Sequence, residues 1–213
     1  MRWAMVIGGS GGIGSAVIDV LNRNNVHVFA PSHTDVDLRD QIKLNPLIAS
    51  DLDYLICCHA APIGATFQQQ IDVDLVGAYN ACMAVLPGMV ERKYGRIVLL
   101  GSIRAQQPRP AGQIAYAAAK AGIEGLARAI AAEYGQYGIT CNVVAPGAVD
   151  TPRTRANIVA GTVSETELIA RTPAGRLATV EDVAAAVLFL CGDGASMING
   201  QVLTVDGGWS ICG

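Results

Sequence analysis

Short apolar runs alternate with longer helical patterns along this chain. The apolar runs are nearly continuous, which is typical of strands buried on both faces of a sheet. Strands separated by helices favour a parallel sheet with helices on both faces, the α/β doubly wound class. Strands are expected at residues 2–7, 26–30, 54–58, 96–100, 139–145 and 201–205, and helices at 12–24, 69–93, 113–134 and 180–190.

The composition favours one folded domain over residues 1–213. Hydrophobic residues make up 51% of the 213 residues and charged residues only 15%, which excludes a disordered chain. The net charge of −3 leaves no basic surface for nucleic acid. Uninterrupted apolar stretches are too short for a membrane span, and the N-terminus does not resemble a signal peptide.

Six cysteines are scattered through apolar runs without the spacing of metal ligands. This usage is typical of buried free thiols in a reducing cytoplasm, so we expect a cytoplasmic protein without a metal site. The longest irregular stretch, residues 146–176, is too long for an ordinary connection and is predicted to form a lid over a substrate.

A glycine-rich turn joins the first expected strand to the first helix. Glycines there let a backbone approach a pyrophosphate, and the helix N-terminus supplies amide donors. Two registers fit: Gly9, Gly11 and Gly14 make G-x-G-x-x-G, whereas Gly8, Gly12 and Gly14 make G-x-x-x-G-x-G. A tight turn without a ligand remains an alternative. The expected cofactor contacts are Gly8, Ser10, Gly11, Gly12, Ile13 and Gly14.

The end of the second expected strand bears on the choice of cofactor. A carboxylate about 20 residues after the glycines is expected to bind the ribose of NAD. Here the strand is followed by Pro31, Ser32, His33 and Thr34, and no acid occurs before Asp35. The three polar residues can bond a 2′-phosphate, so NADP is preferred and NAD is the alternative. A polar turn without a ligand contact is the simpler reading.

Tyr116 and Lys120 lie four residues apart on the alanine-rich helix, and therefore on one face of it. An adjacent ammonium favours the ionised form of a phenol, which suits the pair to acid/base chemistry. Such pairs also occur on solvated helix faces. Ser102 strengthens the catalytic interpretation because it follows a strand, at the carboxyl edge where open α/β sheets bind ligands.

Taken together, these motifs resemble the short-chain dehydrogenase/reductase family, and members similar to 3-oxoacyl-ACP reductases in particular. The resemblance covers nearly the whole chain. It rests on the glycine turn in its second register, on Ser102, and on the Tyr116–Lys120 pair. The further matching segments are residues 95–102, 142–152, 175–177, 181–184, 200–201 and 205–208.

The resemblance implies a Rossmann-like oxidoreductase that moves a hydride between a nicotinamide and a small carbonyl or alcohol substrate. It implies that Ser102 bonds the carbonyl oxygen and that Tyr116 transfers the proton. Lys120 would bind the nicotinamide ribose and favour the ionised form of Tyr116. A homotetramer is expected, with a homodimer as the alternative. Nicotinamide contacts would come from Pro146, Gly147, Val149 and Thr151, and a further cofactor contact from Ala60.

The chain departs from the family pattern at its fourth catalytic position. Asp74 stands where the family has an asparagine that holds a water in a proton relay. An aspartate can hold a water as well, but it adds a charge beside Lys120, so Asp74 is kept as a candidate. Ile7 replaces the usual threonine before the glycines, and residues 57–60, Cys-Cys-His-Ala, replace Asn-Asn-Ala-Gly. His59 is then either a ligand contact or, preferably, a hydrogen-bonded turn residue. One extra residue lies between Ser102 and Tyr116.

The chain is also short between its second and fourth family strands. Residues 35–40 resemble the family's adenine-binding stretch, yet only about four residues separate them from the second strand. A parallel crossover needs a dozen or more residues. We therefore expect six strands, without the family's third strand and its preceding helix. Residues 35–38 should cross the top of the sheet as a coil, so that Asp37 and Leu38 reach the adenine; an antiparallel pairing is the alternative.

Several functional questions stay open. Arg104, Arg109, Arg153 and Arg155 could bind a carboxylate or phosphate of the substrate, or could be solvated surface residues. A catalytically silent nucleotide sensor on the same fold is the first rival to a reductase, and a dehydratase or epimerase is the second. The substrate could be a 3-oxoacyl thioester, a sugar or polyol, a steroid or a small ketone, and the reaction could run in either direction.

Overall fold

A computed structural model describes residues 1–32, 37–38, 51–108 and 113–212 of the chain. Within these residues, six strands form one parallel sheet in the order β2-β1-β3-β4-β5-β6. This confirms the expected fold class and the expected number of strands. The strands are β1 (Arg2–Ile7), β2 (Val26–Phe29), β3 (Tyr54–Cys57), β4 (Gly95–Leu100), β5 (Ile139–Pro146) and β6 (Val202–Val205).

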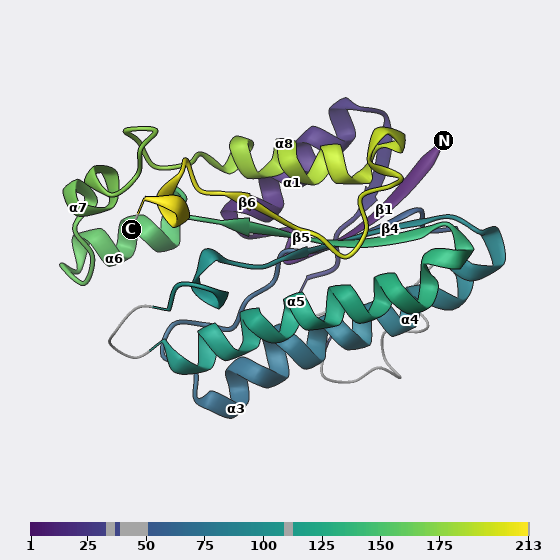
Figure 1. Cartoon of the computed structure of the whole chain (residues 1–213), viewed down its shortest axis with the longest axis horizontal. Coiled ribbons are helices and arrows are strands. Elements are labelled where there is room, and N and C mark those ends of the chain that lie inside the picture. The colour runs from purple at the N-terminus through teal and green to yellow at the C-terminus, as the bar shows by residue number, and fades with distance from the viewer. Residues whose placement is uncertain (33–36, 39–50, 109–112, 213) are drawn as a thin grey trace.

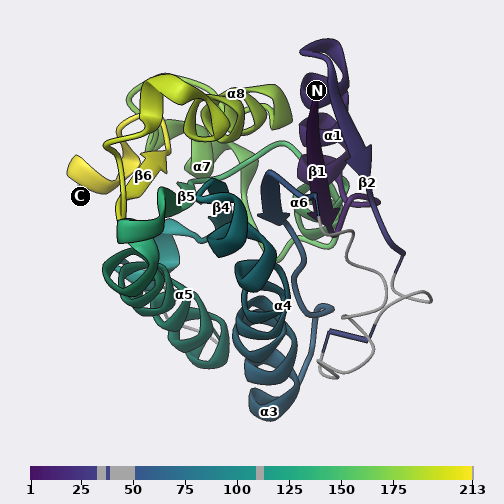
Figure 2. The same cartoon turned by 90° about the vertical axis from the view of Figure 1, so that its right-hand side faces the viewer.

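Helices cover both faces of the sheet (Figure 1). On one face lie α1 (Gly12–Arg23) and α8 (Val180–Cys191), and on the other lie α4 (Gly77–Arg92) and α5 (Ile114–Tyr134). Neighbouring strand residues point to opposite faces, so Met5 packs with α4 and α5 while Val6 packs with α1 and α8. Figure 2 shows these two layers from the side.

The helix before β4 is interrupted. It consists of α3 (Phe67–Gln70), a π-helical turn η2 (Ile71–Val76) and α4. A π turn widens the helix by one residue and occurs frequently at functional sites; here it contains Asp74. Phe67–Arg92 is long and apolar enough to cross a membrane, but half of its most apolar window is buried in this fold. Its packing against the sheet is that of a core helix.

Residues 146–176 are more regular than expected. They contain two helices, α6 (Pro152–Val159) and α7 (Glu165–Ala170). Both begin at hydroxyl caps, because Thr151 accepts a bond from the Thr154 amide and Ser164 accepts one from the Glu167 amide. The prediction of an irregular stretch was wrong here, because Thr151 and Ser164 are capping residues that start helices. Figure 1 shows both helices beyond the carboxyl end of β5.

The shortened region places β2 at the edge of the sheet, as expected. Asp37 and Leu38 belong to no strand. The Leu38 carbonyl accepts a bond of 2.8 Å from Asn80 Nδ2 on α4. Residues 35–36 lie outside the described residues, so their predicted path as a coil stays a prediction. The predicted loss of the family's helix also concerns residues outside the described ranges.

Candidate active site

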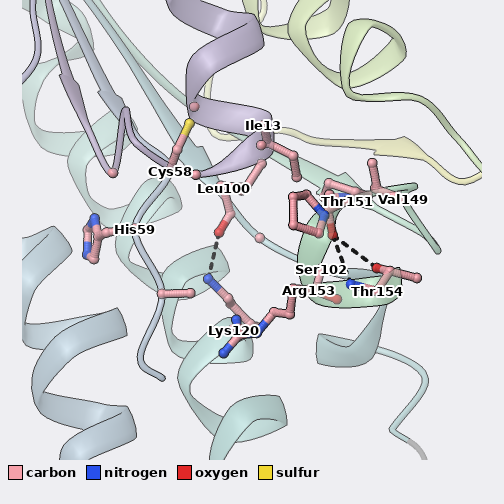
Figure 3. A pocket seen from close by; sticks show the side chains of 18 of the residues that line it. Ile13, Cys58, His59, Leu100, Ser102, Lys120, Val149, Thr151, Arg153 and Thr154 are labelled. Carbon is pink, nitrogen blue, oxygen red and sulfur yellow. Dashed lines mark hydrogen bonds between the residues drawn. The ribbon is translucent and has the colours of Figure 1, made fainter. Parts of the chain in front are cut away.

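One cavity of about 800 Å³ lies at the carboxyl edge of the sheet (Figure 3). It brings together segments that are far apart in the chain: the glycine turn, the loop after β3, the end of β4, α5 and the start of α6. The expected site residues that line it are Gly8, Ser10, Gly11, Gly12, Ile13, Gly14, Ala60, Ser102, Tyr116, Lys120, Pro146, Gly147, Val149 and Thr151.

The glycine turn is shaped for an anion. Gly8 has a φ of +80°, a conformation that other residues rarely adopt. A Cβ on Gly14 would lie 2.1 Å from the Gly8 carbonyl oxygen, so the turn requires glycine there. No side chain caps α1 at Gly11, and its first turn holds no acid. The N-terminal amides of α1 thus face the cavity without a competing carboxylate, which fits the pyrophosphate of a dinucleotide.

A second cavity of about 330 Å³ adjoins the glycine turn. Ser32, Asp37 and Leu38 line it together with Gly8 and Ser10. Three of the residues predicted to contact the adenosine end of the cofactor thus lie around one cavity beside the turn, and their role stays a prediction. His33 and Thr34, the other two expected contacts, lie outside the described residues.

Ser102 is buried at the end of β4, where it caps the short helix η3 (Ile103–Ala105). Its Oγ accepts a hydrogen bond of 3.2 Å from the Arg104 amide. An amide can only donate, so this bond occupies a lone pair and leaves the hydroxyl proton of Ser102 available. The serine can therefore donate to an oxygen in the cavity.

Tyr116 and Lys120 share one face of α5, as their spacing predicts. The Lys120 Nζ lies 5.6 Å from the centre of the Tyr116 ring and donates a bond of 2.9 Å to the Leu100 carbonyl. Figure 3 shows this bond from α5 to the end of β4. Lys120 is 2% exposed, whereas Tyr116 is partly exposed in the cavity wall. The buried ammonium is thus fixed beside a phenol that a ligand can reach.

Asp74 does not line the cavity but lies behind it, with no exposed surface. One oxygen, Oδ1, accepts a bond of 2.6 Å from the Ala61 amide. The other, Oδ2, accepts a bond of 2.8 Å from Gln70 Nε2 and lies 3.5 Å from the Lys120 Nζ. The carboxylate therefore holds the loop after β3 and the lysine at once.

His59 turns away from the catalytic group. Its Nε2 lies 3.0 Å from the Val73 carbonyl oxygen, which can only accept, so this nitrogen carries the proton. Burial and then the charge of Lys120 lower the pKa of His59 to about 4, and Asp74 offsets this only in part. His59 is therefore uncharged near neutral pH and is held as a hydrogen-bonded turn residue.

The comparisons with known proteins agree with this geometry. A family model described as Enoyl-(Acyl carrier protein) reductase matches residues 63–210. The 3-oxoacyl-[acyl-carrier-protein] reductase FabG of Pseudomonas aeruginosa is 42% identical over 138 residues, which cover 65% of this chain and 54% of FabG. The dehydrogenase/reductase SDR family member 6 of Danio rerio is 31% identical over 94% of this chain and 80% of its own length. The chain belongs to the short-chain dehydrogenase/reductase family.

A solved structure of ElxO with NADP bound has a TM-score of 0.87 to this fold, at 26% identity and 98% coverage of both chains. By contrast, the chain spans only about half the length of the FabG relatives that it matches. The similarity to FabG thus concerns part of that protein, whereas the similarity to ElxO extends over the whole fold.

Within this member of the dehydrogenase/reductase family, the four arginines predicted for a substrate anion have different surroundings. Arg155 is paired with Asp150 at 2.6 Å and with Glu165 at 2.8 Å, and Arg104 lies over the Trp209 ring. Arg109 lies outside the described residues. Arg153 lines the large cavity, and it is the arginine of the described three that does so.

The motif search missed three contributors to the site. Ala61 offers its amide to Asp74 and its carbonyl to Arg153, and only tertiary contact could reveal a backbone role. Gln70 bonds Asp74 one helical turn later, and this i, i+4 spacing of two polar residues was a usable signal. Thr154 completes the cap of α6 beside the cavity, for which the threonine–proline pair at residues 151–152 was the signal.

Proposed function

We propose that this chain is an NADP(H)-dependent oxidoreductase that interconverts a carbonyl and an alcohol. The observation that carries the proposal is the meeting of Ser102, Tyr116 and Lys120 with the glycine turn in one cavity. Bound nicotinamide would supply or accept the hydride. The protein's task is then to bind the substrate oxygen, to move one proton and to position the cofactor.

The roles follow from the surroundings of each side chain. Ser102 donates a hydrogen bond to the substrate oxygen. One of the two Oγ lone pairs accepts from the Arg104 amide, and the hydroxyl proton stays available as donor. Tyr116 transfers the proton because it is the acid/base group that borders the cavity beside a fixed ammonium. Lys120 holds the nicotinamide ribose and places its ammonium 5.6 Å from the centre of the Tyr116 ring. Asp74 acts as a positioning residue through Lys120 and Ala61.

The remaining cofactor contacts are assigned to residues that already lie around the two cavities. Gly8, Ser10, Gly11, Gly12, Ile13 and Gly14 would hold the pyrophosphate. Pro146, Gly147, Val149 and Thr151 would hold the nicotinamide, and Ala60, Ser32, Asp37 and Leu38 would surround the adenosine. Residues 146–176 would close over the substrate as a lid. All of these contacts belong to one domain, residues 1–213.

NADP is proposed over NAD for two reasons. No acid occurs at residues 31–34, where a carboxylate would bind the ribose of NAD and repel a 2′-phosphate. The similar protein ElxO has also been solved with NADP bound. Asp37 in the adenosine cavity is the feature that favours the alternative, NAD. Titration of both reduced cofactors decides between them, and a tenfold preference for NADH would overturn the assignment.

The experiment that tests the activity is a nicotinamide fluorescence assay over carbonyl and alcohol panels with both cofactors. A 3-oxoacyl thioester heads the panel because of the similarity to FabG; a sugar or polyol, a steroid and a small ketone complete it. We expect turnover of at least one carbonyl with NADPH. Tight NADPH binding without turnover of any substrate would instead favour a silent nucleotide sensor.

We also propose a reducing cytoplasm as the location of the protein. All six cysteines are free, and Cys57, Cys82, Cys141 and Cys191 are buried in the core. Such thiols persist in a reducing compartment. Burial raises the pKa of the Cys58 thiol, at the cavity wall, to about 12, so this cysteine is not a nucleophile near neutral pH.

A further inference from the structure

The large cavity has an unbalanced charge. Its described lining residues include two permanent cations, Lys120 and Arg153, and no acid. His59 also lines it but is uncharged near neutral pH. Lys120 already bonds the Leu100 carbonyl and pairs with Asp74. The positive charge that remains for a ligand is therefore carried by Arg153.

Arg153 starts beside the anion-binding end of α1. It is the second residue of α6, and the first, Pro152, packs against the glycine turn. A Cβ on Gly12 would lie 3.2 Å from the Pro152 Cδ and 3.6 Å from the Thr151 Cβ. The N-terminal amides of α1 and the root of the Arg153 side chain thus border the same part of the cavity.

From there the side chain crosses to the opposite wall. Arg153 Nη2 donates a bond of 2.6 Å to the carbonyl of Ala61, 92 residues away in the loop after β3. Figure 3 shows Arg153 reaching from the side of Thr151 and Thr154 toward that of Lys120. The guanidinium therefore lies in the cavity rather than on the outer surface of the lid.

The hydrogen bonding of Arg153 leaves capacity for an anion. A guanidinium has five N–H donors, and among the described residues its one hydrogen bond is to the neutral Ala61 carbonyl. Arg155, two residues later, is instead held by the carboxylates of Asp150 and Glu165. A planar fork with unused donors is the group that best binds the oxygens of a phosphate.

We propose that Arg153 binds the cofactor's pyrophosphate from the lid side, opposite the N-terminal amides of α1. This inference rests on the proposed function, since it names a further contact of the same cofactor. The consequence is that the pyrophosphate ties α6 to the glycine turn, so cofactor binding and lid closure are linked through one side chain. A substrate carboxylate or phosphate is the competing ligand for Arg153.

The test compares Arg153→Ala and Arg153→Lys with the control Arg155→Ala. The dissociation constant of NADPH is measured by fluorescence titration, and that of adenosine 2′-monophosphate, which lacks the pyrophosphate, by calorimetry. For Arg153→Ala we expect NADPH to bind about 10- to 100-fold more weakly, in the range of a lost charge-assisted hydrogen bond, with adenosine 2′-monophosphate within twofold of wild type. The salt dependence of NADPH binding should also become flatter.

The control and the conservative variant sharpen the result. Arg155→Ala should leave both dissociation constants unchanged, because that arginine is paired with two carboxylates at the surface. Arg153→Lys should bind NADPH with intermediate affinity, because an ammonium keeps the charge but not the fork. It also provides the measurement if Arg153→Ala fails to fold.

Three outcomes would overturn the assignment of Arg153. The first is wild-type NADPH affinity and salt dependence in a folded Arg153→Ala. The second is an equal loss of NADPH and adenosine 2′-monophosphate, which indicates a general defect of the site. The third is unchanged NADPH binding with a raised KM for an anionic ketone only, which places the substrate on Arg153. If the wild-type protein binds neither NADPH nor NADH, the proposed function itself fails.

Discussion

The Lys120 ammonium and the Asp74 carboxylate face each other at 3.5 Å, and neither has more than 2% of its surface exposed. Removal of one partner of such a buried pair strongly destabilises a folded protein, because the other charge stays buried without compensation. The pair also connects α5, which carries Tyr116, to the π turn η2. Asp74, at the position of the family's asparagine, thus links these two elements through an ion pair.

The first prediction concerns this anchor. Asp74→Ala should lower the free energy of unfolding by about 3–5 kcal/mol, because it leaves Lys120 unpaired and the Ala61 amide without its acceptor. Asp74→Asn keeps an acceptor for that amide and should lose less. Urea unfolding measures both. Asp72→Asn is the control, since among the described residues the side chain of Asp72 accepts one hydrogen bond, from Gln68 at the surface. Equal stability of all three variants would contradict the role of Asp74.

The second prediction concerns the proton. Tyr116→Phe should lower kcat by several orders of magnitude and leave the dissociation constant of NADPH nearly unchanged, because only the hydroxyl transfers the proton. Tyr137→Phe, which changes a tyrosine outside the cavity, should retain full activity. Steady-state kinetics and fluorescence titration provide the two readouts. Substantial activity in Tyr116→Phe would exclude the proposed acid/base group.

The third prediction compares two glycines of the same turn. A methyl group at Gly14 would meet the Gly8 carbonyl oxygen at 2.1 Å, whereas one at Gly11 would meet it at 3.5 Å. Gly14→Ala should therefore cost about 1–3 kcal/mol of stability and abolish cofactor binding, while Gly11→Ala should fold normally. Thermal unfolding separates the two. Similar melting curves would mean that the turn can rearrange.

The fourth prediction concerns acid stability. Because the pKa of His59 is lowered to about 4 in the folded state, the unfolded chain binds the extra proton between about pH 6.5 and 4. Stability should therefore fall as the pH drops through this window, by at most about 1.4 kcal/mol per pH unit from this group. His59→Gln should flatten that part of the profile in urea unfolding at several pH values. An unchanged slope would show that His59 is protonated without cost.

The fifth prediction concerns assembly. Val76, the last residue of η2, and Tyr79, on α4, are 36% and 46% exposed. Small residues on α5 permit close approach of another helix. We expect copies of the chain to pack through these helices as a tetramer with twofold axes. Light scattering should give about four times the chain mass of 22.1 kDa. A dimer is the alternative, and a monomer would refute the prediction.

Local sequence patterns predict much of this fold and of the candidate site. The alternation of strands and helices determines which strand ends share an edge of the sheet, so the sequence alone places Ser102 and the glycine turn at the same edge. The i, i+4 spacing likewise places Tyr116 and Lys120 on one face. Too few residues lie between the second strand and Asp37 for a parallel crossover. That count predicted six strands, and six strands form the sheet in the described part of the chain.

Other features depended on contacts between segments that are distant in the chain. Asp74 was a candidate by position, but its burial and its pairing with Lys120 follow from how the π turn packs on α5. No motif points to the Ala61 carbonyl, yet it accepts a hydrogen bond from the side chain of Arg153 on α6. Spacing along a chain determines which face of its own element a residue occupies. Only the packing of the elements decides which side chain or backbone group from elsewhere meets it there.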